Sequence, residues 1–286
     1  METLERLLPI GMLNAIYGLR ICELRLRIGK PLRIYNGSVW SDARIGDVLY
    51  IVSKSDVDYI IGVASGYSVY SINDSLVRGY LHYEGGIRIG VAGEGVMDGA
   101  KLTTQKYLSY LTIRVPTEVK GCADKIFNKI CDKGEFKNTL VISPTAGGKT
   151  TMLREIARLT SNSGLNVLVI DERFELCAEV KGLPTFDIGV NTDVISGVPK
   201  LIAYENTIRA MNPDVIISDE VFKKEEIDAV IDACRAGVKV GLSVHAESDI
   251  ALKSTVFSPL LDIMQVIIVL SKQVKAGTVV KVIEKC

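Results

Sequence analysis

The sequence predicts an α/β protein of two domains. A smaller α+β domain covers residues 1–116, and a larger domain over residues 117–286 has a mainly parallel sheet with helices on both faces. The chain of 286 residues suggests about two domains. Near Pro116 the pattern changes from alternating polar and apolar residues to short apolar strands separated by helices. Continuous apolar strands between helices are typical of a parallel sheet buried on both faces.

The first domain is predicted from short periodic segments and turn signals. Residues 23–28 alternate polar and apolar side chains, as a half-buried strand does. Asn36-Gly37 is a two-residue hairpin signal, and Ser55 with Asp58 resembles a capping box that begins a helix. The predicted elements are a helix around 4–8, strands over 23–28, 32–35 and 39–40, a helix over 55–65, and strands over 79–83, 87–91 and 111–115. This domain has no catalytic signature.

The second domain is predicted to alternate strands and helices. Its strands are expected over 140–143, 166–170, 214–218, 238–244, 264–270 and 278–283, and its helices over 149–159 and 223–236. The last of these helices is amphipathic and is followed by Gly237, a residue that commonly ends helices.

A glycine-rich segment, Ser143-Pro-Thr-Ala-Gly-Gly-Lys-Thr150, lies between a predicted strand and a predicted helix. It matches the phosphate-binding loop G-x-x-x-x-G-K-[ST] except at Ser143, where the pattern has glycine. Backbone N–H groups at such a helix start bind phosphate, Lys149 would reach the β and γ phosphates, and Thr150 would bind Mg²⁺. The alternative is an ordinary turn with a chance Gly-Lys-Thr. The predicted nucleotide-binding residues are Ser143, Pro144, Thr145, Ala146, Gly147, Gly148, Lys149, Thr150 and Thr151.

Two acids follow the apolar strand that ends at Ser218. In phosphate-binding-loop enzymes the first such acid orients Mg²⁺ and the next activates the attacking water. The sequence therefore predicts that Asp219 binds the metal and that Glu220 and Lys149 are catalytic residues.

Further polar residues follow other strands, and carboxyl ends of parallel strands face the ligand crevice. In Asp171–Glu175 we predict Glu172 and Glu175 to be catalytic, by holding Mg²⁺ or positioning water; a capping turn is the alternative. His245 would sense the γ-phosphate, or else is a rim histidine. Arg209 is the best placed arginine to stabilise transition-state charge, often in a neighbouring subunit, although a surface salt bridge is the plainer reading.

Composition excludes several classes. The 34 Lys+Arg balance 34 Asp+Glu, which gives no electrostatic argument for nucleic acid or an anionic membrane. The apolar stretch over 257–270 is too short and too interrupted to span a bilayer, so we expect a cytoplasmic protein without direct membrane insertion. With 2 histidines, a His-rich metal site is excluded.

These motifs resemble, in the same order, the phosphate-binding loop, acidic box, Walker B strand and histidine box of the type II and type IV secretion ATPases. The closer resemblance is to the stage III AA family of sporulation proteins, a branch found in endospore-forming bacteria. The residues that carry it are 23–31, 86–93, 113–115, 119–124, 170–173 and 212–220. The resemblance implies a RecA-like P-loop core that hydrolyses ATP with Mg²⁺.

The resemblance also implies a homo-hexamer, peripheral on the mother-cell side of a membrane. It would energise a secretion-like channel complex made with the membrane proteins of stage III sporulation. Ser143 and Ala146 replace glycines usual in secretion ATPases, which predicts a stiffer loop and weaker nucleotide binding, whereas Asp219 in place of a glycine favours hydrolysis. The alternatives are a nucleotide-gated scaffold with little turnover and a nucleic-acid-translocating ATPase.

Overall fold

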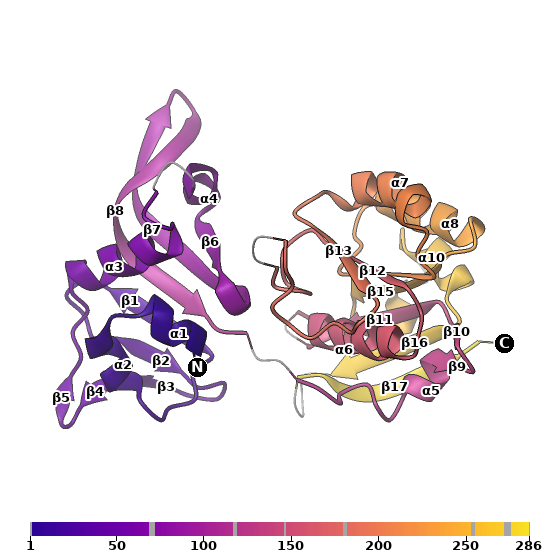
Figure 1. Ribbon diagram of the computed structural model, residues 1–286, viewed down its shortest axis with the longest axis horizontal. Helices are drawn as coiled ribbons and strands as arrows, with labels where there is room; N and C mark the ends of the chain where they lie inside the picture. Colours follow the sequence, from indigo (N-terminus) through magenta and orange to yellow (C-terminus); the bar gives the residue numbers. More distant parts are fainter. Residues whose placement is uncertain are drawn as a thin grey trace. The chain divides into compact units, whose positions relative to one another are not determined.

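The computed structural model describes residues 2–68, 72–116, 119–145, 147–179, 182–252, 255–271 and 276–285. The chain divides into two compact units, Met1–Thr117 and Glu118–Cys286. Each unit has its own sheet and its own hydrophobic core, and each is described here by itself (Figure 1).

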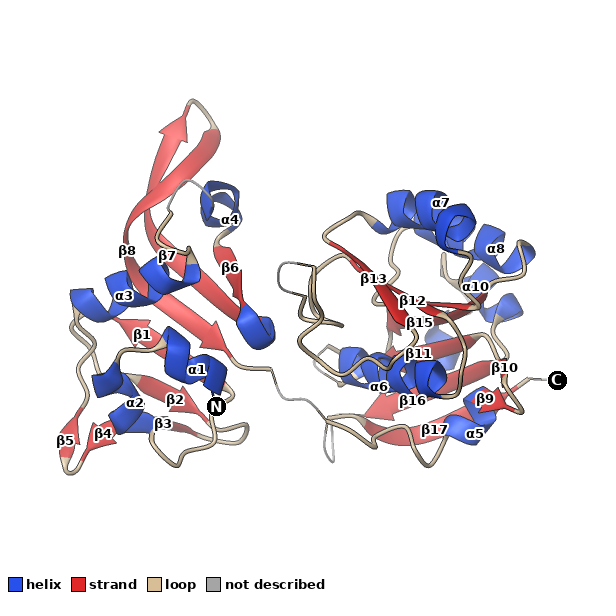
Figure 2. Cartoon of the chain, viewed as in Figure 1, coloured by secondary structure: helices blue, strands red, loops and turns tan. Residues whose placement is uncertain are grey.

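The N-terminal unit contains a six-stranded antiparallel sheet in the order β3-β2-β1-β8-β7-β6 (Figure 2). Its strands are β1 (Glu23–Arg27), β2 (Arg33–Tyr35), β3 (Trp40–Asp42), β6 (Tyr80–Tyr83), β7 (Ile87–Asp98) and β8 (Lys101–Arg114). A small pair is formed by β4 (Arg44–Ile45) and β5 (Val48–Leu49), and the helices are α1 (Glu2–Leu7), α2 (Ile10–Ile16), α3 (Lys54–Ala64) and α4 (Asn73–Arg78).

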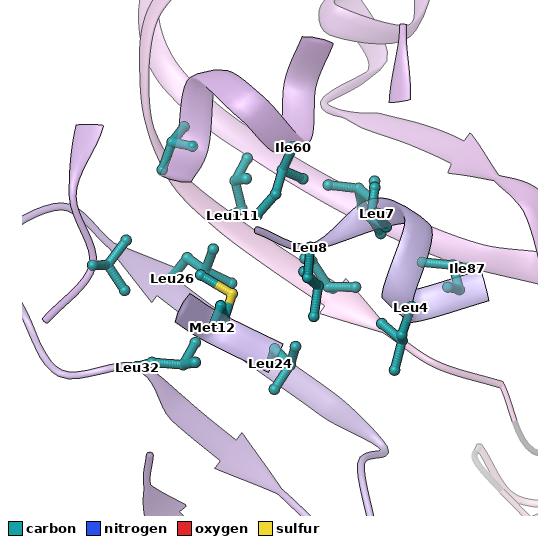
Figure 3. Packing of buried hydrophobic residues seen from close by; sticks show 14 of the residues in the cluster. Leu4, Leu7, Leu8, Met12, Leu24, Leu26, Leu32, Ile60, Ile87 and Leu111 are labelled. Atoms are coloured by element: carbon teal, nitrogen blue, oxygen red, sulfur yellow. The ribbon is translucent and has the colours of Figure 1, made fainter. Parts of the chain in front are cut away.

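The core of this unit lies between its helices and one face of its sheet. Leu7, Met12 and Ile60 come from α1, α2 and α3 and pack with Leu24 and Leu26 of β1 (Figure 3). Alternate residues of a strand point to opposite faces, so the neighbours of Leu24 and Leu26 point to the other face. Those neighbours are Glu23, Arg25 and Arg27, and all three are half-buried.

Two details of this unit differ from the sequence prediction. The capping box of α3 is formed by Ser53 and Asp56: the Asp56 N–H donates to Ser53 Oγ (3.1 Å), and the Ser53 N–H donates to Asp56 Oδ2 (2.8 Å). The prediction that placed it at Ser55 and Asp58 was therefore wrong by two residues. Strands β7 and β8 also extend well beyond the strands predicted over 87–91 and 111–115, with a register shift beside Gly93, where a Cβ would lie 2.5 Å from the Lys106 carbonyl oxygen.

The C-terminal unit contains a seven-stranded sheet in the order β13-β12-β14-β15-β11-β16-β17, parallel except for β17, which is antiparallel to β16. Its strands are β11 (Thr139–Ser143), β12 (Val167–Asp171), β13 (Thr192–Ser196), β14 (Val215–Ser218), β15 (Lys239–His245), β16 (Val266–Ser271) and β17 (Thr278–Glu284). A separate hairpin is formed by β9 (Cys131–Asp132) and β10 (Glu135–Phe136).

Helices cover both faces of this sheet. One face packs against α7 (Lys200–Met211), α8 (Lys224–Arg235), α9 (Asp249–Leu252) and α10 (Ser258–Ile263), and the other against α5 (Phe127–Ile130) and α6 (Lys149–Asn162) (Figure 1). The predicted fold class, an α/β core preceded by a smaller α+β unit, is confirmed. Strand β13 was not predicted because none of its residues is buried, so it lacks a continuous apolar run. The β9–β10 hairpin was not predicted because each of its strands has only 2 residues. Within the described residues, no helix is long and apolar enough to cross a membrane.

Candidate functional site

The loop between β11 and α6 has the backbone that a phosphate-binding loop needs. Gly148 precedes α6 with φ 93°, in the left-handed region that favours glycine. A Cβ at Gly147 would lie 1.7 Å from Ser143 Oγ and 3.0 Å from the Pro144 carbonyl oxygen. Both positions therefore require glycine, and the loop enters a helix of 14 residues whose N-terminal N–H groups favour an anion.

Ser143 stands where the pattern has glycine, and it fits. Its side chain is fully buried, and its hydroxyl donates to the Pro144 carbonyl oxygen (2.9 Å). The Gly147 N–H donates to the same oxygen (3.1 Å), so Ser143 and Gly147 share one acceptor. Ala146, the other predicted departure from glycine in this loop, lies outside the described residues.

Lys149 turns back over the loop. Its ammonium group donates to the Ser143 carbonyl oxygen (3.2 Å). Burial lowers the pKa of Lys149, and the nearby Glu220 opposes that shift. Thr150 and Thr151 follow in the first turn of α6 and are half-buried. This arrangement places an ammonium group and two hydroxyl groups at the start of the helix.

The two acids after β14 have different surroundings. Asp219 is buried, and one of its oxygens lies 3.1 Å from the Lys200 ammonium group. Burial raises the pKa of Asp219 to about 6, against the lowering effect of Lys200. Glu220 is half-buried and lies 3.4 Å from Arg173. In this structure both predicted acids are thus held by cations of the chain itself.

The acids after β12 have two different roles in the structure: one caps a turn and the other pairs with a lysine. Asp171 is buried and accepts N–H groups of Glu175 and Cys177 (2.8 Å each), so it caps its own turn; the expectation that it faces the ligand was wrong. Glu172 accepts a hydrogen bond from Lys200 (3.1 Å). Arg154 of α6 donates to the carbonyl oxygens of Glu175 (2.7 Å) and Leu176 (2.6 Å). The acidic loop is therefore tied to the helix that begins at Lys149.

Two residues from other parts of the sheet contact the loop: His245, which ends β15, and Gly277, which directly precedes β17. Ser143 and His245 are register partners at the ends of β11 and β15, and the His245 ring is hydrogen-bonded to the Thr145 hydroxyl. The Gly277 N–H donates to the Gly147 carbonyl oxygen (2.9 Å). His245 thus lies at the rim of the loop, the position that the sequence predicts for it.

Arg209 does not join these residues. It is exposed in the last turn of α7, nine residues and therefore roughly 13 Å along the helix from Lys200. Its predicted contribution to the site within its own chain is wrong, because α7 carries it toward the opposite end of the sheet. A contribution to a neighbouring copy stays a prediction.

The sequence analysis missed Lys200, whose ammonium group joins Glu172 to Asp219. Lys200 is the first residue of α7, a helix that was not predicted. Position alone carries no signal, because Lys54, Lys149 and Lys224 also begin helices, and of these lysines only Lys200 is buried between two carboxylates.

The analysis also missed an arginine-rich face of the N-terminal sheet, defined by Arg25, Arg27, Arg33, Arg78, Arg88 and Arg114. Two hollows lie on it. One of about 250 Å³ is lined by Arg25, Arg27, Arg33 and Trp40. The other, of about 340 Å³, is lined by Arg25, Arg78, Gly79, Tyr80, Arg88, Gly90, Thr112 and Arg114. The signal was the alternating arginines in Glu23–Arg27, which the balanced charge of the whole chain conceals.

Aromatic rings and two acids accompany these arginines. Arg25 and Arg33 lie 5.2 and 5.8 Å from the Trp40 ring, and Arg88 lies 4.0 Å from the Tyr80 ring. Glu23 pairs with Arg25 (2.7 Å) and Arg114 (3.5 Å), and Asp42 pairs with Arg33 (3.0 Å). In the described part of the chain, these two acids pair with three of the six arginines.

The residues of the C-terminal unit fit a nucleotide with Mg²⁺. No group of three or more His, Cys, Asp or Glu side chains in the described part of the chain could hold a metal by itself. Mg²⁺ needs no such group, because it is commonly bound by one or two protein oxygens together with phosphate and water. The Thr150 hydroxyl and the Asp219 carboxylate are suitable oxygens. The Cβ positions of Gly147 and Gly148 are taken by Ser143 Oγ and the Gly277 backbone, so the phosphate fit rests on the N-terminal N–H groups of α6 and on the Lys149 ammonium group.

Comparisons with solved structures identify the fold. The Legionella pneumophila ATPase DotB superposes with a TM-score of 0.60 over 92% of this chain and 76% of that chain, at 17% identity. The pilus retraction motor PilT, solved with bound ADP, gives a TM-score of 0.62 over 91% of this chain and 76% of that chain, also at 17% identity. The chain thus has the RecA-like fold of the secretion ATPases.

Sequence comparison narrows that class. The model of the family "Sporulation stage III, protein AA" matches residues 6–286. "Stage III sporulation protein AA" of Bacillus subtilis (strain 168) is 31% identical over 262 residues, which are 87% of this chain and 82% of that protein. The chain belongs to the sporulation stage III protein AA family.

Proposed function

We propose that the protein is an ATPase that hydrolyses ATP with Mg²⁺. The observation that carries the proposal is the meeting of four separate segments at one edge of the parallel sheet. Lys149 and Thr145 come from the loop after β11, Glu172 follows β12, Asp219 and Glu220 follow β14, and His245 ends β15. An ordinary turn with a chance Gly-Lys-Thr would not gather these groups.

Each group has a role that follows from its position. Backbone N–H groups of residues 148–151 and the Lys149 ammonium group would hold the phosphates. Thr150 and Asp219 would hold Mg²⁺, which neutralises phosphate charge when bound. Glu220 would accept the proton of the attacking water, and Arg173, 3.4 Å away, orients its carboxylate. His245, bonded to Thr145, would report the state of the loop, and Glu175 stays a candidate for positioning water.

We further propose that the protein acts as a homo-hexamer at the mother-cell side of a membrane. There it would energise the secretion-like channel complex of the stage III sporulation membrane proteins. Family membership and the secretion-ATPase fold support this assignment. The arginine-rich face supports a contact between the N-terminal unit and the phosphate-binding core of a neighbouring copy, because its guanidinium groups suit phosphate and carboxylate.

Two other functions each have an observation in their favour. The ion pairs Lys200–Asp219 and Arg173–Glu220 favour a nucleotide-gated scaffold with little turnover, since both acids are engaged. The arginine-rich face, with Trp40 and Tyr80, favours a nucleic-acid-translocating ATPase, since aromatic rings and arginines bind single strands. That second function would require affinity for single strands that falls steeply with salt.

The test compares turnover with binding in three proteins. For the wild type we expect Mg²⁺-dependent release of phosphate from ATP. Glu220→Gln should bind ATP but turn it over about 10²–10⁴ times more slowly, as loss of a general base predicts. Lys149→Ala should lose binding as well. Normal hydrolysis by Lys149→Ala would contradict the ATPase proposal, and equal low turnover of wild type and Glu220→Gln with intact binding would favour the scaffold.

A further inference from the structure

Lys200 is the most deeply buried cation of the site. Its side chain is fully buried, and its ammonium group lies 3.1 Å from Glu172 and 3.1 Å from Asp219. Taking a charge out of water is costly unless it is paired, so two carboxylates are needed to hold it there. Lys200 is also the first residue of α7, where the positive end of the helix opposes a cation. The fold therefore keeps this lysine in place against both the cost of burying a charge and the repulsion from the helix N-terminus.

The two carboxylates come from adjacent strands. Strands β12 and β14 are paired in parallel, with Ile170 beside Ser218, so Glu172 and Asp219 both lie just past the carboxyl edge of the sheet. Two carboxylates at such an edge are the ligand type that a divalent cation prefers. In this structure the lysine fills that place with a single positive charge.

The helix is fixed beside the strand by a second contact. One turn after Lys200, the buried Tyr204 hydroxyl is hydrogen-bonded to the Ser218 hydroxyl (3.0 Å). Tyr204 and Lys200 thus attach the first turns of α7 to the end of β14. Packing consequently fixes the position of the Lys200 ammonium group, and the ion pair with that group fixes the position of the Asp219 carboxylate.

We propose that Lys200 is a positioning residue that takes the place of a divalent cation between Glu172 and Asp219 while no nucleotide is bound, so that Mg²⁺ enters the site together with the nucleotide. A cation arriving alone would meet a like charge a few ångströms away and a carboxylate that is already paired. The phosphates of a nucleotide bring negative charge that offsets this repulsion. The inference rests on the proposed nucleotide site for the role of Asp219.

The experiment measures Mn²⁺ binding to the metal-free, nucleotide-free protein by the loss of the free Mn²⁺ signal in electron paramagnetic resonance. We expect Lys200→Met to bind one Mn²⁺ per chain at least tenfold more tightly than the wild type. The double variant Lys200→Met/Asp219→Asn should lose that gain. Lys224→Met is the matched control, because Lys224 is also the first residue of a helix but is exposed, and it should bind as the wild type does.

Two results would overturn the inference. The first is a folded Lys200→Met that binds Mn²⁺ no more tightly than the wild type. The second needs only the wild-type site, and so applies even if Lys200→Met does not fold: tight wild-type binding that Asp219→Asn abolishes. Because no nucleotide is used, failure here leaves the ATPase proposal in place, and a failed turnover assay leaves the Mn²⁺ result in place.

Discussion

The two sheets of this molecule place their charged groups in different ways. The parallel sheet of the C-terminal unit is buried on both faces, and its candidate site residues lie at the carboxyl ends of β12, β14 and β15. The antiparallel sheet of the N-terminal unit buries one face and spreads arginines over the other. The first arrangement concentrates chemistry in a few short loops, and the second distributes recognition over a surface.

The difference has consequences for mutation. A site made by a few loops should be destroyed by one badly placed methyl group. A surface made by alternate residues of several strands should tolerate one change and respond to several. Substitutions in both units can test this contrast.

The largest effect is expected from Gly147→Ala. The added Cβ would lie 1.7 Å from Ser143 Oγ, so the loop must shift, and we expect ATP affinity to fall about 10²-fold or more. Ser143→Gly in the same chain removes the atom in conflict and should recover part of the affinity. Isothermal titration with ATP and Mg²⁺ measures both.

The matched change in the other sheet is Gly90→Ala. Gly90 lines the larger hollow of the arginine-rich face, but a Cβ there would lie 3.6 Å from Thr112 Cβ, an ordinary contact. We expect ATP affinity and stability close to the wild type. A loss as large as that of Gly147→Ala would break the contrast between the two sheets.

The cores should respond separately. Leu24→Ala and Ile216→Ala each remove a fully buried side chain, one from each unit, at a cost of about 2–5 kcal/mol in the free energy of unfolding. Trp40 is the single tryptophan of the chain, so its fluorescence reports unfolding of the N-terminal unit. Hydrogen exchange of peptides from 139–283 reports the other unit. Equal destabilisation of both units by either variant would show that they unfold as one body.

The arginine-rich face is tested by removing two of its members together. We expect Arg88→Ala/Arg114→Ala to lower ATP turnover about tenfold, as loss of transition-state or interface charge predicts, with ATP affinity almost unchanged. Lys54→Ala is the control, because Lys54 is an exposed cation of the same unit on α3. Unchanged turnover in the double variant would remove the proposed contact with a neighbouring copy.

The smallest effect is expected from pH, and its sign differs between the units. Burial, together with Arg88 and Arg78, lowers the pKa of His82 to about 4, so the unfolded chain binds more protons between about pH 4 and 6.5 and the N-terminal unit gains stability as pH rises. The raised pKa of Asp219, about 6, means that its carboxyl binds more protons in the folded state between about pH 4 and 6, so the contribution of Asp219 to the stability of the C-terminal unit falls as pH rises over that range.

These opposite slopes are measured by the same two reporters as a function of pH. His82→Gln should flatten the rise in the N-terminal unit, and Asp219→Asn should flatten the fall in the C-terminal unit. Slopes of the same sign in both units would contradict this prediction.

Most of the C-terminal unit was predictable from the sequence, because its signals are local. Glycine, lysine and threonine are consecutive in the loop, and the acids directly follow apolar strands. Lys200 was not predicted, since its partners Glu172 and Asp219 are distant in the sequence and only the pairing of β12 with β14 brings them together. Asp171 and Glu172 were both expected to face the ligand crevice. In the structure the buried Asp171 caps its own turn, whereas Glu172 pairs with Lys200. Which of two adjacent acids is buried cannot be predicted from a short motif.

The arginine-rich face was harder to predict for a physical reason. Its members come from α4 and from strands far apart in the sequence, and their grouping depends on the strand order β3-β2-β1-β8-β7-β6. The net charge of the whole chain does not reveal such a face, because acids elsewhere in the chain balance its arginines. A local count of charge on alternate residues of each predicted strand would have found part of it.

The most direct test of the account is ATP turnover per chain as a function of the concentration of the protein, measured beside Lys149→Ala and Glu220→Gln. If sites of the C-terminal unit are completed by the arginine-rich face of another copy, turnover per chain should rise with concentration and then level off, and both variants should stay near zero throughout. Turnover that is independent of concentration, or that is equal in the wild type and both variants, would contradict the account.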